Sequence, residues 1–250
     1  MDAIHMKFGA PPKVALLSAQ RVPLQPDQVG EVFGASYLRL MEDYGLRPVL
    51  VPTLLPRFIE DYVAEVDGAV IAGVEWGGPD PSPARWGERY GAQAHVDEKT
   101  ENYIGTFATA MLASNRPVLG ISYGAEVLAS LFGSTLESTT GHAPVDQPGL
   151  VRTYIQPAQS ARYYDGAGLP VRCMHGWAIK HLGLQLAAEA VSVPTSSSPQ
   201  VIEAFRLNHS VARLLGVNYH PDRPDPESGL HGDPFVAQFA EWCRDAARIS

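Results

Sequence analysis

Short apolar runs alternate with segments of helical periodicity along the first half of the chain. Each run has the length of a buried strand, and the segments between the runs repeat their apolar residues at amphipathic-helix spacing. Strands that alternate with helices predict right-handed crossovers and a parallel sheet covered on both faces. The predicted strands are residues 13–19, 47–53, 68–74 and 116–122, and the predicted helices are residues 30–45 and 99–115.

After residue 133 the pattern changes to shorter β-like pieces that are joined by turns instead of helices. We expect some of these strands to pair antiparallel for that reason. An amphipathic helix over residues 233–249 closes the chain. The predicted strands of this half are residues 150–156, 169–175, 184–193, 200–207 and 213–220.

The chain of 250 residues is long enough to bury a sizeable core, and its 45% hydrophobic and 18% charged residues are typical of globular proteins. With no internal repeat, we predict a single α/β domain over residues 1–250. His5-Met6 resembles a cloning junction, with a native start as the alternative, so residues 1–5 are left out of the fold prediction. A Pro/Gly-rich loop over residues 73–92 is either functional or a solvated excursion.

Charge and apolar length exclude several classes of partner. The formal net charge is -8, and no dense cluster of lysine and arginine suggests binding to nucleic acid or to an anionic membrane. No stretch approaches the roughly 18 apolar residues of a membrane span, and the N-terminus has no apolar core of signal-peptide length. Cys173 and Cys243 show no C-x-x-C spacing, so we expect no disulfide framework and no zinc or dithiol motif. A soluble protein of the reducing cytoplasm is the expected class.

The segment GISYG, residues 120–124, fits the pattern G-x-S-x-G of a nucleophile elbow. A side chain on a sharp turn from strand to helix is exposed at the edge of the sheet, where the following N–H and the helix N-terminus stabilise an oxyanion. The flanking glycines are needed because the turn leaves no room for larger residues. A glycine-flanked serine that caps a helix has the same short pattern, so Ser122 needs partners to count as a nucleophile.

Such partners occur near the C-terminus, where His220 ends an apolar strand and Asp222 follows two residues later. A histidine can take the nucleophile's proton only if a third group fixes its tautomer, and a nearby carboxylate can fold back to do so. The order Ser122, His220, Asp222 differs from that of the α/β-hydrolases, in which the acid precedes the histidine. The chain also lacks the His-Gly-Gly of their oxyanion loop.

This order resembles that of the class I glutamine amidotransferase superfamily, and within it the free-standing γ-glutamyl hydrolases. The resemblance covers most of the chain and implies a flavodoxin-like fold, in which helices flank a central, mostly parallel sheet. DGAVIAGVEW resembles the family's oxyanion strand, and PARWGE resembles its P-x-x-(aromatic)-G-E loop. RPVLGISYGAEVLASLFGSTL resembles the nucleophile block. VRCMHGWAIKHLG resembles the family's segment V-N-S-x-H-H-Q, and LGVNYHPD resembles its closing G-V-Q-W-H-P-E.

The resemblance implies a role for each matching residue. Ser122 takes the nucleophile position, His220 acts as general base and acid, and Asp222 orients it. No metal and no organic cofactor are implied. The backbone N–H groups that stabilise the oxyanion would be those of Gly73 or Val74 and of Tyr123. The wall that holds the glutamyl backbone would include Cys173, Met174 and His175, with packing as the alternative for Cys173 and Met174.

Serine at position 122 is the central departure, because the family has cysteine there. A thiol has a pKa of about 8.5 that falls further beside a histidine, whereas a serine must lose its proton during attack. Three explanations stay open: an engineered replacement, a natural serine nucleophile, and a natural pseudoenzyme that binds a γ-glutamyl-like ligand without cleaving it.

Other departures concern the substrate. The family's glutamine four residues after the nucleophile is Glu126 here, its glycine pair is Gly73-Val74, its H-H-Q is His175-Gly176-Trp177, and its final glutamate is Asp222. An acid near the pocket would favour an ammonium-bearing or donor-rich ligand and repel a second carboxylate. The alternative is that Glu126 only occupies the first turn of a helix, where negative charge is favourable.

We therefore predict an enzyme that hydrolyses a small-molecule γ-glutamyl-type amide through a covalent acyl intermediate. The departures favour an unusual γ-glutamyl amide over glutamine or folate-type substrates. A catalytically silent ligand-binding domain and a serine esterase of the α/β-hydrolase type are the alternatives. A homodimer is compatible with this prediction.

Overall fold

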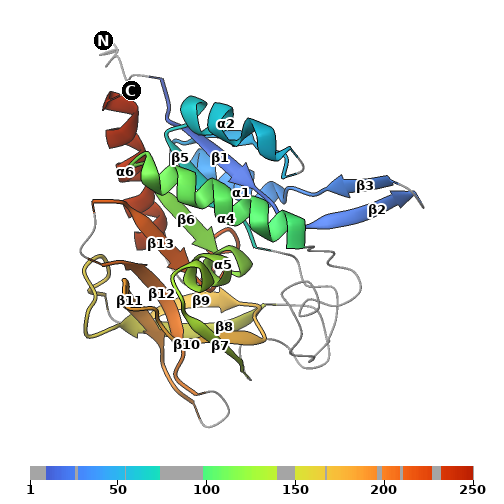
Figure 1. Cartoon of the computed structure of the whole chain (residues 1–250). Coiled ribbons are helices and arrows are strands. Elements are labelled where there is room, and N and C mark those ends of the chain that lie inside the picture. The colour runs from blue at the N-terminus through green and yellow to red at the C-terminus, as the bar shows by residue number, and fades with distance from the viewer. Residues whose placement is uncertain are drawn as a thin grey trace, which may run out of the picture.

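The structure is a computed structural model that describes residues 10–25, 28–53, 55–73, 98–139, 150–166, 168–195, 199–208, 211–226 and 232–249. Its N-terminal half, together with one strand from near the C-terminus, builds the parallel part of a large sheet (Figure 1). Neighbouring strands of this part run parallel in the order β4 (Arg47–Leu50), β1 (Lys13–Leu17), β5 (Gly68–Ile71), β6 (Val118–Ile121) and β13 (Leu214–Val217).

The C-terminal half extends the same sheet with antiparallel strands, as the turn-rich sequence predicts. They follow β13 in the order β12 (Ile202–Leu207), β11 (Leu186–Ser192), β8 (Val151–Pro157) and β9 (Leu169–Cys173). Off this path, β10 (Trp177–His181) pairs with β12 and with β7 (Thr135–Ser138). Within the described residues the sheet has 11 strands.

Helices cover both faces of the parallel part, as predicted for alternating strands and helices. Successive residues of β1 point to opposite faces, so Val14 and Leu16 pack in one apolar cluster while Ala15 and Leu17 pack in the other. The first cluster includes residues of α1 (Ala35–Asp43) and α6 (Pro234–Ile249). The second includes residues of α2 (Ile59–Glu65), α4 (Glu98–Ala113) and α5 (Tyr123–Leu131). None of the helices in the described part of the chain is long and apolar enough to cross a membrane.

Most predicted strands and the helix predicted over residues 30–45 are longer than the observed elements, and two of these differences have a clear structural reason. The helix predicted over residues 30–45 begins only at Ala35, because the preceding residues form a separate ribbon, β2 (Arg21–Gln25) and β3 (Gln28–Glu31). This ribbon extends away from the large sheet in Figure 1. The strand predicted over residues 213–220 ends at Val217, because Val217 is its last residue paired with β6. His220 therefore lies in the turn after β13 and not in the strand.

Several short elements are not predicted by the apolar pattern, namely η1 (Pro56–Phe58), α2, β7, β10 and the β2–β3 ribbon. The sequence of β7, TLES, has no apolar run, which fits its exposed and half-buried positions. Tertiary pairing with β10 decides their conformation.

The sheet places the predicted site residues at one edge. β5, β6 and β13 are adjacent and parallel, with Ile71 opposite Gly120 and Val217 opposite Ile121. Their carboxyl ends therefore meet, and the residues that follow them come together. Ligands of open α/β sheets bind at such carboxyl ends.

Candidate active site

Ser122 occupies a strained backbone position between β6 and α5. Its φ is 52° and its ψ is -115°, in a region that residues other than glycine rarely adopt. Hydrogen bonds maintain this turn: the Ser122 N–H donates to the Val217 carbonyl at 2.7 Å, and the Ser122 carbonyl accepts from Ala125 and Glu126 at 2.9 and 3.1 Å. The strain and its support are those of a nucleophile elbow.

The two glycines of the motif are required by close backbone contacts. A Cβ atom at Gly124 would lie 2.2 Å from the backbone oxygen of Ile71, and one at Gly120 would lie 2.6 Å from the oxygen of Gly124. Neither backbone oxygen can move as a flexible side chain would. The pattern G-x-S-x-G thus has a steric cause in this fold.

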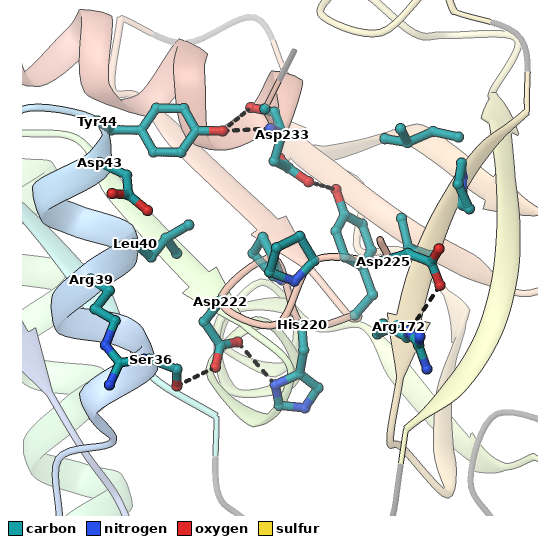
Figure 2. A pocket seen from close by; sticks show the side chains of 17 residues that line it. Ser36, Arg39, Leu40, Asp43, Tyr44, Arg172, His220, Asp222, Asp225 and Asp233 are labelled. Atoms are coloured by element: carbon teal, nitrogen blue, oxygen red, sulfur yellow. Dashed lines mark hydrogen bonds and ion pairs between the residues drawn. The ribbon is translucent and has the colours of Figure 1, made fainter. Parts of the chain in front are cut away.

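His220 and Asp222 form a buried pair in the turn after β13. The Nδ1 atom of His220 lies 3.2 Å from Oδ1 of Asp222, and the other carboxylate oxygen accepts a hydrogen bond of 2.6 Å from the Ser36 hydroxyl (Figure 2). Burial opposes ionisation of Asp222, but the hydrogen bond and charge of His220, the Ser36 hydroxyl and the Arg223 guanidinium together keep its pKa below the ordinary value. An ionised Asp222 favours the His220 tautomer with its proton on Nδ1, which is the arrangement that a general base needs.

Ser122 and His220 converge on the space beside Gly73. A Cβ atom built at Gly73 would lie 3.0 Å from the Ser122 Cβ and 3.2 Å from the His220 Cε1, so both side chains border the same point. Within the described part of the chain, the buried Nε2 of His220 has no hydrogen-bond partner. Catalytic hydrogen bonds are often long without substrate and tighten in the complex. The structure thus brings together the three residues that the sequence indicated.

The N–H groups expected to stabilise the oxyanion have different surroundings in the structure. Gly73 lies beside Ser122, but its N–H donates at 2.9 Å to the hydroxyl of Tyr37, so this N–H is not directed at the reacting centre. Val74 lies outside the described residues. Tyr123 begins α5, where the first-turn N–H groups have no acceptor within the helix. Its side chain is buried, and its hydroxyl donates to Glu101 at 3.1 Å.

The turn that carries His220 and Asp222 is anchored to the antiparallel half. The His220 N–H donates to the Arg172 carbonyl at 2.8 Å. Asp225, whose side chain is buried, accepts from Arg152 and Arg172, with both Nε atoms 2.8 Å from its Oδ2. Two half-buried arginines on β8 and β9 thereby fix the position of the histidine.

A pocket of about 620 Å³ lies behind the His220–Asp222 pair, between α1, β9 and this turn (Figure 2). Ser36, Arg39, Arg172 and Asp225 are among the residues that line it. Ser122 does not line it, so this pocket is adjacent to the base and the acid but is not where an acyl group would be bound.

Cys173 and His175, which the resemblance places on the substrate wall, lie in a second buried cluster with Glu203. His175 is 1% exposed, its Nδ1 lies 2.8 Å from the Trp177 carbonyl, and its Nε2 lies 3.4 Å from Oε2 of Glu203. The Cys173 thiol donates to Oε1 of Glu203 at 3.7 Å. Burial opposes the charged form of His175, but Glu203 and Glu126 outweigh it and raise its pKa. Burial and the Glu203 charge raise the pKa of the Cys173 thiol well above its ordinary value.

Glu126 occupies the first turn of a helix, which is one of the two alternatives considered from the sequence. It lies in the first turn of α5, is fully buried, and acts electrostatically on His175. Its carboxylate therefore belongs to the cluster of Cys173, His175 and Glu203. Met174, which lies between Cys173 and His175 in the sequence, is buried as well. In the described residues, the ligand atoms of Cys173, His175 and Glu203 form the group that could hold a metal ion.

Sequence reasoning missed Ser36, Tyr37 and Glu203. Ser36 and Tyr37 lie on α1, where Tyr37 fits the apolar periodicity and Ser36 is an ordinary polar position. Glu203 lies between two apolar residues in β12, a position that in sequence is typical of a solvent-facing strand residue. No local signal distinguishes these residues, because their partners are distant in sequence.

Comparison with known proteins identifies relatives and structural neighbours. A glutamine amidotransferase-like protein, YvdE, of Lactococcus lactis subsp. lactis is 25% identical over 197 residues, which cover 75% of this chain and 79% of the relative. Its homologue in Lactococcus lactis subsp. cremoris is 27% identical over 164 residues, covering 61% and 85%.

Solved structures share the fold at low identity. A GMP synthase component from Thermoplasma acidophilum has a TM-score of 0.62 at 17% identity, and the match covers 97% of this chain and 98% of that one. The acivicin-bound glutaminase domain of Trypanosoma brucei CTPS has a TM-score of 0.61 at 15% identity, with 94% of each chain covered. The model of the Peptidase C26 family matches residues 18–222. The chain, with its elbow, its adjacent histidine and aspartate, and its amidotransferase-like sheet, therefore belongs to the Peptidase C26 family.

Proposed function

We propose that this protein hydrolyses a γ-glutamyl-type amide through a covalent acyl-enzyme, with Ser122 as the nucleophile. The observation that carries the proposal is the strained backbone of Ser122, with φ at 52°, directly beside the buried His220–Asp222 pair. Strain of this kind costs about 1–3 kcal/mol and persists where the surrounding structure imposes it, commonly at active sites.

The geometry suggests a role for each group. His220 Nε2 takes the Ser122 proton as Oγ attacks the amide carbon, and Asp222 stabilises the imidazolium through Nδ1. The tetrahedral oxyanion forms near the N-terminus of α5, where the Tyr123 N–H and the helix dipole favour negative charge. His220 then returns the proton to the leaving amine as the carbon–nitrogen bond breaks. A water molecule, deprotonated by the same base, hydrolyses the ester and regenerates Ser122.

Serine changes the demands on the base relative to cysteine. A thiolate can be held as an ion pair with histidine before substrate binds, whereas a serine loses its proton only during attack. The Ser36 hydroxyl and the Arg223 guanidinium both help keep Asp222 ionised, which strengthens its effect on His220. This support favours a working base beside Ser122.

The γ-glutamyl class is proposed from the relatives and from the sequence resemblance to γ-glutamyl hydrolases. The relatives are named as glutamine amidotransferase-like, and a glutamine side chain is itself a γ-glutamyl amide. The family match is to Peptidase C26, which removes support from the α/β-hydrolase alternative.

A silent ligand-binding protein of the same fold is the second candidate. The Gly73 N–H, which the sequence suggested as an oxyanion donor, is engaged by the Tyr37 hydroxyl. If that bond persists with substrate bound, one donor is lost, and loss of a single oxyanion donor lowers turnover about 100- to 1000-fold.

The test compares the Ser122 protein with Ser122→Cys and Ser122→Ala on a panel of γ-glutamyl amides, following release of glutamate. Turnover by the serine protein that is lost in Ser122→Ala supports a native serine nucleophile. Turnover only in Ser122→Cys supports an engineered or decayed cysteine enzyme. Mass spectrometry should detect the acyl adduct on the active form.

Folding of all three proteins is checked by circular dichroism and thermal melting. Absence of turnover in every folded form, across the whole panel, contradicts the hydrolase proposal. Saturable binding of a γ-glutamyl amide by all three forms without turnover would then favour the silent alternative.

A further inference from the structure

We propose that Cys173, His175 and Glu203 form a buried binding site for one zinc ion, independent of the hydrolytic site. Their ligand atoms, one from each residue, all lie within 4.8 Å of one another, and each residue is at most 1% exposed. The three come from β9, the segment after it, and β12. A thiol, an imidazole and a carboxylate are the ligand types that zinc takes in proteins.

Two contacts in this cluster are close to the separations of tetrahedral coordination, and all three ligand atoms lie within 4.8 Å of one another. Zinc–ligand bonds of about 2.0–2.3 Å at the tetrahedral angle place neighbouring ligand atoms about 3.4–3.6 Å apart. The Cys173 Sγ lies 3.7 Å from a Glu203 oxygen, and the His175 Nε2 lies 3.4 Å from the other oxygen. Small side-chain shifts would therefore suffice to bind the ion.

The hydrogen bond of His175 orients its ring as a metal ligand. Its Nδ1 lies 2.8 Å from the Trp177 carbonyl, which can only accept, and 3.3 Å from the Asn218 amide nitrogen; the shorter contact assigns the proton to Nδ1. The lone pair of a neutral ring then lies on Nε2, directed at Glu203. Metal-binding histidines almost always donate their other N–H to a carbonyl or carboxylate in this way. Two acceptors 3.4 Å apart need a cation or a proton between them.

The charges around the cluster also favour a cation. Glu203 and Glu126 are both fully buried, and both act on His175. Tyr219 and Asn218 face the same cluster and bring no positive charge. Buried carboxylates are unfavourable unless they are paired or coordinate a metal. A divalent ion brings two positive charges, which offset the Glu203 carboxylate and the thiolate that Cys173 becomes on binding.

Zinc binding replaces protons and needs no other reactant. The ion displaces the thiol proton that Cys173 now donates to Glu203, and any proton on His175 Nε2, and both are released to solvent. Coordination deprotonates the thiol although burial alone raises its pKa. Because the site is buried, we expect loading during folding. This inference departs from the sequence-based expectation that no metal is bound.

The experiment uses the tag-free full chain, refolded with zinc chloride and dialysed against metal-free buffer. Mass spectrometry of the metal content should find about one zinc per chain in the parent. Cys173→Ser and Glu203→Gln, which preserve side-chain shape, should hold at least tenfold less zinc. Cys243→Ser, which changes a buried cysteine on α6, is the matched control and should keep the parent's zinc content.

Refolding with cobalt chloride provides a second readout. The parent and Cys243→Ser should show the charge-transfer absorption of a cobalt–thiolate bond, and Cys173→Ser should not. A parent that binds no zinc, or equal zinc content in all four proteins, overturns the proposal. If Cys173→Ser fails to fold, the absence of the cobalt–thiolate band from the folded parent overturns it equally.

Discussion

At the scale of single residues, the candidate site depends on contacts between distant parts of the chain. Ser36 and Asp222 are 186 positions apart, yet their side chains meet at 2.6 Å. Asp222, the acid of the proposed mechanism, therefore has one oxygen near His220 and the other bound to a hydroxyl on α1. Ser36 acts through Asp222, so it is a positioning residue.

Ser36→Ala should lower kcat about tenfold and leave KM nearly unchanged, because a hydrogen bond to a charged group is worth about 1.5–3 kcal/mol and His220 and Arg223 retain part of it. The measurement uses a γ-glutamyl amide that the parent or Ser122→Cys hydrolyses. Carbon NMR of Asp222 should show its pKa raised in the variant, since a group that stabilises the carboxylate is removed.

Ser36→Thr, which keeps the hydroxyl, is the matched control and should restore both values. An unchanged Asp222 pKa in Ser36→Ala would contradict the positioning role, whether or not the protein has measurable turnover.

At the scale of elements, the elbow depends on how closely α5 approaches β5. The absence of a side chain at Gly124 lets the first turn of the helix lie against the Ile71 carbonyl. This contact sets the height of Ser122 above the sheet edge. The motif is therefore a packing requirement as well as a chemical one.

Gly124→Ala should destabilise the protein by about 3 kcal/mol, because the new methyl would lie 2.2 Å from backbone that cannot give way. Gly176→Ala is the control: a Cβ atom there meets nothing within 4 Å, and its φ is not positive, so its effect should stay below about 1 kcal/mol. Urea unfolding followed by circular dichroism measures both. Equal stability of the two variants would show that α5 can shift without cost.

At the scale of the whole molecule, each of the two apolar clusters on opposite faces of the sheet has a tyrosine beside or within it: Tyr44 is half-buried and Tyr103 is buried. Burial, with the charge of Asp233 and then of Asp43, raises the pKa of Tyr44 to about 12. Burial, with the charges of Tyr62 and Glu31, likewise raises the pKa of Tyr103 to about 12. Both groups stay neutral in the folded state at pH values where they ionise in the unfolded chain.

The free energy of unfolding should therefore be unaffected by these tyrosines below about pH 10, and should fall as the pH rises from about 10 to about 12. The sign follows because the folded state retains the phenol proton that the unfolded state loses. Urea unfolding at a series of pH values measures the slope. Tyr44→Phe should reduce that slope, and a slope that is unchanged would contradict the assignment to Tyr44.

The sequence predicted most elements of the parallel half, because buried strands and amphipathic helices are recorded in the spacing of contiguous residues. It failed where strand pairing decides the conformation: β7 carries no apolar run, and residues 30 and 31, predicted as the start of a helix, belong to β3. It also extended β13 to His220, because nothing local shows that pairing ends at Val217.

The sequence by itself determined the elbow around Ser122 and the spacing of His220 and Asp222, since a sharp turn and a short H-P-D segment are properties of neighbouring residues. Only the tertiary structure decided what surrounds them. The Ser36 contact with Asp222, the bond between Gly73 and Tyr37, and the meeting of Glu203 with Cys173 and His175 join segments that only the sheet brings together. Hydrogen bonds and ion pairs of this kind depend on distance in space, which the order of residues along the chain does not record.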